Sequence, residues 1–278
     1  MRCSAISHDN RFSLLAIDAL TELAERSGIN MQQPSEIKRL EHTLTKVVKE
    51  CAGFYSGVLL SPDIGYNALF EKKDSAGVVF PLERRLFDAD PLSIPILKEH
   101  WGVAAIAQNY GVAKLELFYH PEEKEAITKQ QIVAELYDYC KHENIDLILE
   151  LILYIEGTEA EYTAQLPGLQ LRAVKEFRSL CSLLALEYPL NALNTVTLTA
   201  ELDIPWILTA RTTPYEIFKE QLRTALESGA VGYMGSSFFF PPMPEVGQSS
   251  FSQEELEDFI IRTGKDRVAE LYRIVSGS

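Results

Sequence analysis

Charged side chains interrupt a short apolar run of this chain, at a spacing that places them on one face of an extended strand. Lys114 and Glu116 lie two residues apart in the run 112–119, and Leu115 and Leu117 alternate with them. Side chains two apart in a strand project to the same side, so the charged pair shares one face and the leucines share the other. Because burying an unpaired charge costs several kcal/mol, the pattern indicates either an ion-pair network or a polar site.

Other apolar runs contain or end in polar residues of the same kind. Glu150 lies in the run 146–154, Glu187 in the run 182–188, and Asp18 closes the run 12–18. Thr209 and Arg211 share one face of the run 206–211. If the runs are parallel strands of one barrel, six of these side chains converge: Asp18, Lys114, Glu116, Glu150, Glu187 and Arg211. His120 follows the run 112–119, where a catalytic role and simple exposure both stay open.

The elements that must position these side chains follow a regular order, in which short apolar runs alternate with longer amphipathic segments. The predicted strands are residues 12–18, 55–60, 77–80, 112–119, 146–154, 182–188, 206–211 and 231–235. The predicted helices are residues 34–51, 94–110, 121–142, 159–178, 214–228 and 252–275, the last broken near Gly264. We read residues 63–65 as a loop and 238–250 as a long irregular loop.

Eight strand–helix units with near-continuous apolar strands predict an α/β fold, a single (β/α)8 TIM barrel spanning residues 1–278. An open doubly wound sheet is the alternative. No glycine-rich GxGxxG turn follows the first run, which disfavours dinucleotide binding.

The composition of the chain disfavours several classes of binding partner. The net charge of −14 disfavours nucleic acid and anionic membranes. No apolar run approaches the roughly 20 residues of a membrane span, and residues 1–10 lack the apolar core of a signal peptide. The four cysteines are scattered without a CxxC pair, so we expect a cytoplasmic protein without a zinc site or other cofactor.

The order and spacing of several segments resemble the class I tagatose-1,6-bisphosphate aldolases and the related sulfofructose-phosphate aldolases. The similarity extends from about residue 12 to 237. The segments that carry it are residues 15–18, 59–65, 113–115, 186–190, 205–209 and 228–230, together with Glu150 and Gly235. The family fold is the (β/α)8 barrel, in agreement with the strand pattern.

This resemblance implies a Schiff-base active site, and this chain departs from the family at the position of the lysine. In the family a lysine on the sixth strand forms a Schiff base with a ketose carbonyl, two residues before the glutamate of a Glu-Tyr-Pro element. Glu187 sets that register here, and the lysine position holds Ala185. The family's catalytic positions that are kept are Asp18, Lys114, Glu150 and Glu187.

The family's phosphate-binding residues also differ. Ala19, Ser61, Arg211 and Ser236 stand where the family has glutamine, aspartate, glycine and arginine. The residues expected to contact substrate are Glu116, Thr209, Arg211, Gly235 and Ser236.

Three functions stay open. The first is a binding or regulatory pseudoenzyme that takes a small molecule such as a ketose phosphate. The second is an active aldolase or transaldolase-like lyase that uses Lys114 as its nucleophile. The third is a carboxylate- or metal-assisted isomerase or epimerase on the same barrel. A homo-oligomer is compatible with each.

Overall fold

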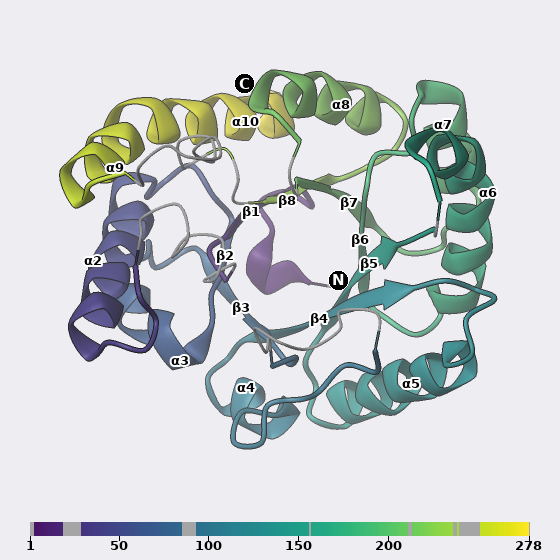
Figure 1. Cartoon of the computed structure of the whole chain (residues 1–278), viewed down its shortest axis with the longest axis horizontal. Coiled ribbons are helices and arrows are strands. Elements are labelled where there is room, and N and C mark those ends of the chain that lie inside the picture. Colours follow the sequence, from purple (N-terminus) through teal and green to yellow (C-terminus); the bar gives the residue numbers. More distant parts are fainter. Residues whose placement is uncertain are drawn as a thin grey trace.

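Eight parallel strands form a closed barrel in which each strand pairs with the next along the chain and β8 pairs with β1 (Figure 1). The structure, a computed structural model, describes residues 3–18, 29–84, 93–155, 157–210, 213–235, 238 and 251–277. The strands are β1 Phe12–Ala16, β2 Gly57–Leu59, β3 Gly77–Pro81, β4 Val112–Tyr119, β5 Leu147–Leu153, β6 Leu183–Leu186, β7 Trp206–Ala210 and β8 Gly232–Gly235. The predicted TIM barrel is confirmed.

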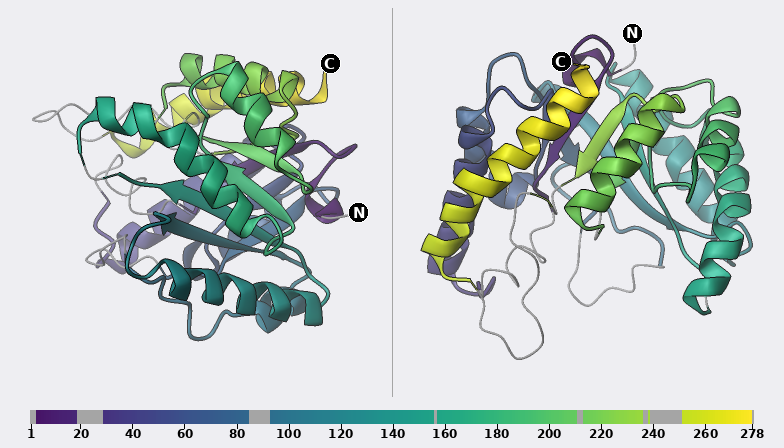
Figure 2. Two further views of the ribbon diagram at one scale, coloured as in Figure 1. Left: turned by 90° about the vertical axis from the view of Figure 1, so that its right-hand side faces the viewer. Right: turned by 90° about the horizontal axis from the view of Figure 1, so that it is seen from above.

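Helices surround the barrel on its outer side (Figure 2). They are α2 Pro34–Glu50, α3 Pro62–Gly65, α4 Val103–Gln108, α5 Ala126–His142, α6 Glu159–Phe177, α7 Ala192–Ala200, α8 Tyr215–Glu227, α9 Gln253–Phe259 and α10 Lys265–Ser276. A 3-10 segment, η2 Tyr66–Glu71, follows α3, and a π-helical turn, η3 Ile260–Gly264, joins α9 to α10 near the predicted break. The two termini lie at the same end of the barrel in both views of Figure 2.

Part of the predicted helix 94–110 is wrong. Only α4 is helical, because Pro95 and Gly102 precede it and both disfavour a helix interior. The main chain before α4 instead runs beside the end of β3. The amide of Arg84 donates to the carbonyl of Ile96 at 2.7 Å, and the amide of Lys98 donates to the carbonyl of Leu82 at 2.9 Å.

Other differences are local. Residues 63–65, read as a loop, belong to α3. Helix α5 begins at Ala126 rather than at residue 121, since residues 121–125 form turns. Helix α7 was missed by the sequence pattern; Asn191 caps it by accepting from the amide of Asn194 at 3.0 Å. Most of the predicted loop 238–250 lies outside the described residues, but Phe238 is buried and stacks on Phe218 with ring centroids 5.7 Å apart.

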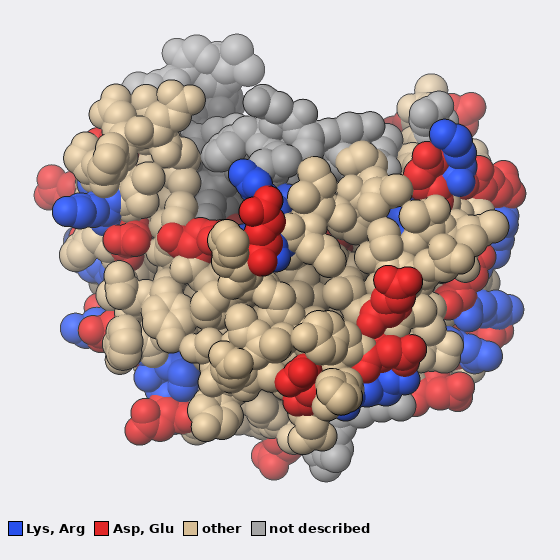
Figure 3. Space-filling model, turned by 90° about the horizontal axis from the view of Figure 1, so that it is seen from below, with Lys and Arg blue, Asp and Glu red and all other residues tan. Residues whose placement is uncertain are grey.

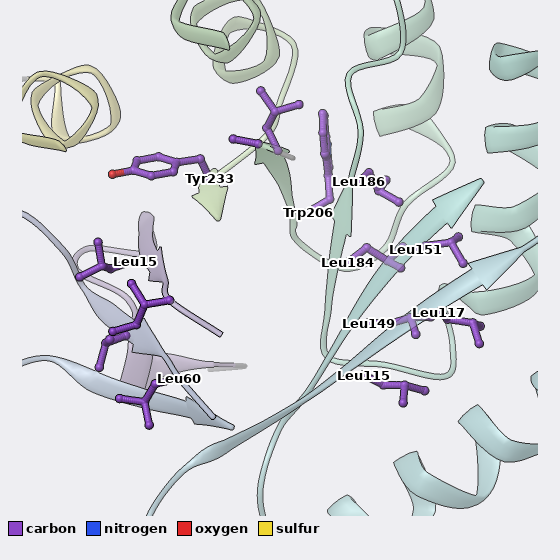
Figure 4. Packing of buried hydrophobic residues seen from close by; sticks show 14 of the residues in the cluster. Leu15, Leu60, Leu115, Leu117, Leu149, Leu151, Leu184, Leu186, Trp206 and Tyr233 are labelled. Atoms are coloured by element: carbon purple, nitrogen blue, oxygen red, sulfur yellow. The ribbon is translucent and has the colours of Figure 1, made fainter. Parts of the chain in front are cut away.

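Two apolar layers hold the barrel together. Leu115, Leu117, Leu149 and Leu151 point from β4 and β5 toward the surrounding helices (Figure 4). A second cluster lies inside the barrel, and it contains Phe12, Leu14, Leu59, Val79, Val112, Ile148, Leu183, Ala185, Ile207 and Met234. The strands are therefore buried on both faces, as the continuous apolar runs predicted.

The amino-terminal segment closes one end of the barrel. The 3-10 turn η1 Ser4–Ile6 is the purple coil within the ring of strands in Figure 1. The Ser56 hydroxyl donates to the carbonyl of Ile6 at 2.7 Å. A Cβ atom at Gly77 would lie 2.0 Å from the carbonyl oxygen of Ala5, so this close approach requires glycine.

The surface agrees with the acidic composition. On the face around α4 and α5, acidic and basic side chains are scattered among uncharged ones, and the coloured atoms include no extended basic area (Figure 3). Among the described helices none is both long and apolar enough to cross a membrane.

Replacing Gly77 with alanine tests the packing of this closing segment. We expect Gly77→Ala to lower the free energy of unfolding by about 1–3 kcal/mol, because the added methyl must displace the main chain at Ala5. Chemical denaturation measures the change. The matched control is Gly168→Ala within α6, where a Cβ meets nothing within 4 Å and should be neutral or stabilising. Equal effects of the two substitutions would contradict this account.

Candidate functional site

A buried lysine surrounded by carboxylates occupies the barrel interior. Lys114 is 0% exposed, and its ammonium lies 2.8 Å from Glu150 Oε2 and 3.1 Å from Glu83 Oε1. Asp18 Oδ2 and Glu116 Oε2 lie 3.6 Å and 3.7 Å away. All four carboxylate side chains are at most 13% exposed. We call these five residues the lysine cage.

Strand alternation explains how the cage forms. Lys114 and Glu116 face inward from β4, while Leu115 and Leu117 between them join the outer core. Glu150 is the register partner of Glu116 on β5. Asp18 and Glu83 follow β1 and β3, two residues after the last residue of each strand. Four strands of a parallel barrel therefore bring their charged side chains toward its carboxyl end, where barrel enzymes have their active sites.

Electrostatics keep Lys114 charged. Burial is the largest single effect on its pKa and acts to lower it. The carboxylates of Glu150, Glu83, Asp18 and Glu116 act in the opposite direction, and together they raise the pKa of Lys114 well above its ordinary value. The amine is consequently protonated at neutral pH, and it can stabilise negative charge or donate hydrogen bonds.

Sequence reasoning missed Glu83. The predicted third strand ends at residue 80, so Glu83 lies beyond it and was not assigned to the site. In the structure Pro81 is the last residue of β3 and pairs with Lys114, and the amide of Leu82 donates to the carbonyl of Lys114 at 2.8 Å. Extending the alternation from Val79 through Pro81 would have placed Glu83 on the inner face.

Ala185 faces the barrel interior. It is 0% exposed, belongs to the inner apolar cluster, and is the register partner of Glu150 on β5. Its methyl group therefore lies on the strand next to a cage carboxylate.

Glu187 lies outside the cage. It comes after the end of β6, and its Oε2 accepts a hydrogen bond from the Tyr162 hydroxyl at 3.1 Å. Its carbonyl accepts from Gln170 Nε2 at 3.0 Å. These contacts join Glu187 to α6, and among the described residues it is not an ion-pair partner of Lys114. Its convergence with Arg211 stays a prediction, because Arg211 lies outside the described residues.

The remaining predicted residues lie on β7 and β8 or outside the described part of the chain. Thr209 is 6% exposed on β7. Gly235 ends β8, and a Cβ atom there would lie 2.6 Å from the Ala210 methyl. Arg211 and Ser236 are outside the described residues. In the part of the chain that the structure describes, no group of three or more histidine, cysteine or acidic side chains is arranged to hold a metal ion.

The barrel fold is shared with solved fructose-bisphosphate aldolases. The crystal structure of an archaeal fructose 1,6-bisphosphate aldolase superimposes with a TM-score of 0.67 at 14% identity, covering 98% of this chain and 97% of that one. Fructose-bisphosphate aldolase from Slackia heliotrinireducens gives 0.66 at 14% identity, covering 99% and 88%. At this identity the likeness establishes the fold.

Sequence comparison identifies the family. Residues 4–181 match the family described as "Uncharacterized protein conserved in bacteria (DUF2090)", and the chain belongs to that family. Tagatose 1,6-diphosphate aldolase 2 of Enterococcus faecalis is 27% identical over 248 residues, which are 78% of this chain and 75% of that protein. Tagatose 1,6-diphosphate aldolase 1 of Streptococcus pyogenes serotype M1 is 26% identical over 155 residues, 54% of this chain and about half (48%) of that protein. The chain is thus a distant relative of the tagatose aldolases, as its motifs predicted.

Removing the Lys114 ammonium should destabilise the folded protein. We expect Lys114→Met to lower the free energy of unfolding by about 3–5 kcal/mol, because four carboxylates lose the charge they surround. Chemical denaturation at neutral pH measures this. The control is Lys124→Met, because the Lys124 side chain is 92% exposed and its ammonium pairs with Glu125 at the surface; its effect should stay within about 0.5 kcal/mol.

Comparing wild type with Lys114→Met over a range of pH also tests whether Lys114 is charged. A raised pKa in the folded state means that the charged amine stabilises the fold at every pH below the unfolded lysine pKa. That contribution is lost only as pH rises through the higher folded pKa. As pH rises from neutral, the stability difference between wild type and Lys114→Met should therefore shrink only in strongly alkaline solution. If this stability difference shrank as pH rose through the neutral range, Lys114 would not be held in its charged form.

Proposed function

We propose that this protein binds a sugar phosphate of the ketose class in an aldolase-type barrel and does not form a Schiff base with it. The distant relationship to tagatose aldolases supports the ligand class. Two facts together carry the proposal. Ala185 has no amine, and the carboxylates around Lys114 keep its amine protonated. The protein would then act as a binding or regulatory member of a family of enzyme-like barrels.

The position of Ala185 supports the loss of the usual nucleophile. Its side chain lies in the barrel interior on β6, beside Glu150 on β5. A lysine there would extend from the inner face of β6 toward the cage and could reach a ligand carbonyl held above it. An alanine methyl can only contact that ligand.

Lys114 is a poor replacement nucleophile. Schiff-base formation requires the neutral amine, and an ordinary lysine has fewer than about one neutral amine in 1,000 at pH 7. The cage raises the pKa of Lys114 further and makes that fraction smaller. The charged amine is suited to a different role, donating a hydrogen bond to a carbonyl or hydroxyl oxygen of a bound ligand.

The isomerase alternative has less support. Proton transfer at a sugar carbon needs two groups on opposite sides of the substrate. Asp18 and Glu150 both face the same ammonium, at 3.6 Å and 2.8 Å, so their carboxylates are engaged with one cation. A metal-assisted version would need ligands that the described residues do not group together.

Borohydride trapping tests this proposal. With dihydroxyacetone phosphate, we expect no reduced adduct on the wild-type protein, and an adduct on residue 185 of Ala185→Lys. Peptide mass mapping locates the modified residue. Ala185→Met, which has similar length and no amine, is the matched control and should remain unmodified.

An adduct on Lys114 of the wild-type protein would refute the absence of Schiff-base chemistry. The binding half of the proposal is tested separately by thermal shift. We expect ketose phosphates to raise the melting temperature of the wild-type protein, and the unphosphorylated sugars to raise it less.

A further inference from the structure

An apolar pair of residues lies next to the lysine cage, on the two strands that carry Glu116 and Glu150. Phe118 is the register partner of Ile152, as Glu116 is of Glu150 two residues earlier on each strand. Each residue of a strand advances about 3.3 Å, so the apolar pair lies roughly 6–7 Å further along β4 and β5, toward the carboxyl end of the barrel. We call Phe118 and Ile152 the collar.

Strand alternation turns both collar residues toward the barrel interior. Their neighbours along β4 and β5 all belong to the outer core: Leu117, Tyr119, Leu151 and Leu153. Figure 4 shows Leu117 and Leu151 directed toward the surrounding helices. Successive side chains of a strand point to opposite faces, so the collar residues point inward, as Glu116 does. Both lie within strands that are still paired, where this alternation holds.

The most exposed carboxylate of the cage is the one nearest to Phe118 along β4. Lys114 is 0% exposed, whereas the Glu116 side chain is 13% exposed, more than the other three carboxylates. Glu116 and Phe118 are both partly exposed, while Leu117 and Tyr119 are buried under the helices. A ligand that reaches the cage along β4 from the carboxyl end of the barrel therefore passes Phe118 first.

The main chain of Phe118 is held from the outer side of the barrel. Its carbonyl accepts from Lys129 Nζ of α5 at 2.8 Å, and the same ammonium donates to Glu123 Oε2 at 2.7 Å. Lys129 is 0% exposed, and the Tyr154 hydroxyl donates to that Glu123 oxygen at 2.8 Å. Because this ion pair is buried, it fixes the end of β4 and with it the distance between Phe118 and the cage.

The cage and the collar suit different parts of a ligand. Four carboxylates around one ammonium repel a phosphate, whereas Lys114 can donate to a carbonyl or hydroxyl oxygen. The collar side chains contain no polar atoms, so a phosphate beside them would lose water without gaining a hydrogen bond. Carbon-bound hydrogens pack well against such side chains. A ketose phosphate with its carbonyl at the cage therefore places its carbon chain beside the collar.

We propose that Phe118 is a ligand-binding residue whose ring contacts the carbon chain of the ketose phosphate, and that this contact discriminates between chain lengths. The inference rests on the proposed function. In dihydroxyacetone phosphate a single carbon separates the carbonyl from the phosphate ester, so the phosphate lies beside the ring. In xylulose 5-phosphate three carbons separate them, so the chain covers the ring and the phosphate extends beyond it into water.

Titration calorimetry with these two ligands tests the length preference. We expect wild type to bind xylulose 5-phosphate about five-fold more tightly than dihydroxyacetone phosphate, the size of effect typical of an aromatic contact. Phe118→Ala should bring the ratio of the two affinities close to one, chiefly by weakening the longer ligand. Phe70→Ala, which removes a ring that is 80% exposed on η2, is the matched control and should leave the ratio unchanged.

Ring-current shifts measure the contact itself. The carbon-bound hydrogens of xylulose 5-phosphate should move upfield when it binds to wild type, and the shift should be lost with Phe118→Leu, which keeps an apolar side chain but has no ring. If Phe118 only supports the fold, Phe118→Leu will lower the melting temperature and leave both the upfield shift and the affinity ratio as in wild type.

The outcomes separate this inference from the proposed function. If wild type binds both ligands equally well, or if Phe118→Ala and Phe118→Leu keep the wild-type ratio, the role of Phe118 is refuted and the proposed function stands. If wild type binds neither ligand, the proposed function fails and the role of Phe118 fails with it.

Discussion

One buried ammonium constrains most of this barrel. Lys114 is removed from water, which is unfavourable for a charge unless oppositely charged groups surround it closely. Those groups come from four places along the chain: Asp18 after β1, Glu83 after β3, Glu116 on β4 and Glu150 on β5. A shift of register by one residue in any of these segments would turn its carboxylate toward the outer core. The ion pairs and the apolar packing therefore specify the same strand alignment.

This constraint also determines what the site can do. A lysine that performs nucleophilic chemistry must lose its proton, and the cage that stabilises the fold opposes that loss. With Ala185 on the neighbouring inner face, no amine is available there to share the task. The chain has the barrel fold of solved fructose-bisphosphate aldolases, and under the proposed function its charges would hold a polar ligand. Stability of the buried charge and Schiff-base reactivity are alternatives at Lys114, and the structure favours the first.

The sequence predicts the parts of this site that follow from local alternation. Lys114 and Glu116 are recognisable because they alternate with the apolar residues Ala113, Leu115 and Leu117, and Glu150 because it interrupts an apolar run. Glu83 is not recognisable in this way, since its inward direction depends on β3 continuing through Pro81 and on pairing with β4. The direction of Glu187 is also hard to predict, because β6 ends at Leu186, after which alternation no longer fixes where a side chain points; in the structure Glu187 contacts Tyr162.

Helix predictions fail where local propensity and tertiary contacts disagree. Helix α7 is rich in threonine and asparagine, which are weak helix formers, yet it is capped by Asn191 and packs Leu198 into the core. Residues 94–102 have the apolar content of a helix, but Pro95 interrupts it and the main-chain pairing with Leu82 and Arg84 is available instead. Neither choice can be read from spacing alone, because each depends on a partner distant in sequence.

Strand β4 connects the lysine cage with a second buried ion pair, between Lys129 and Glu123. Its pairing with β5 is the longest in the barrel, from Ala113 opposite Leu147 to Tyr119 opposite Leu153. Lys114 lies near the start of that ladder, and the carbonyl of Phe118, which accepts from Lys129, lies near its end. Because the strand between them is paired with β5 along this whole length, neither centre can shift along β4 without disrupting the other. A ligand that contacts both the cage and the mouth would meet groups whose separation is set by a rigid strand, and rigid spacing of this kind favours ligands of one length over others.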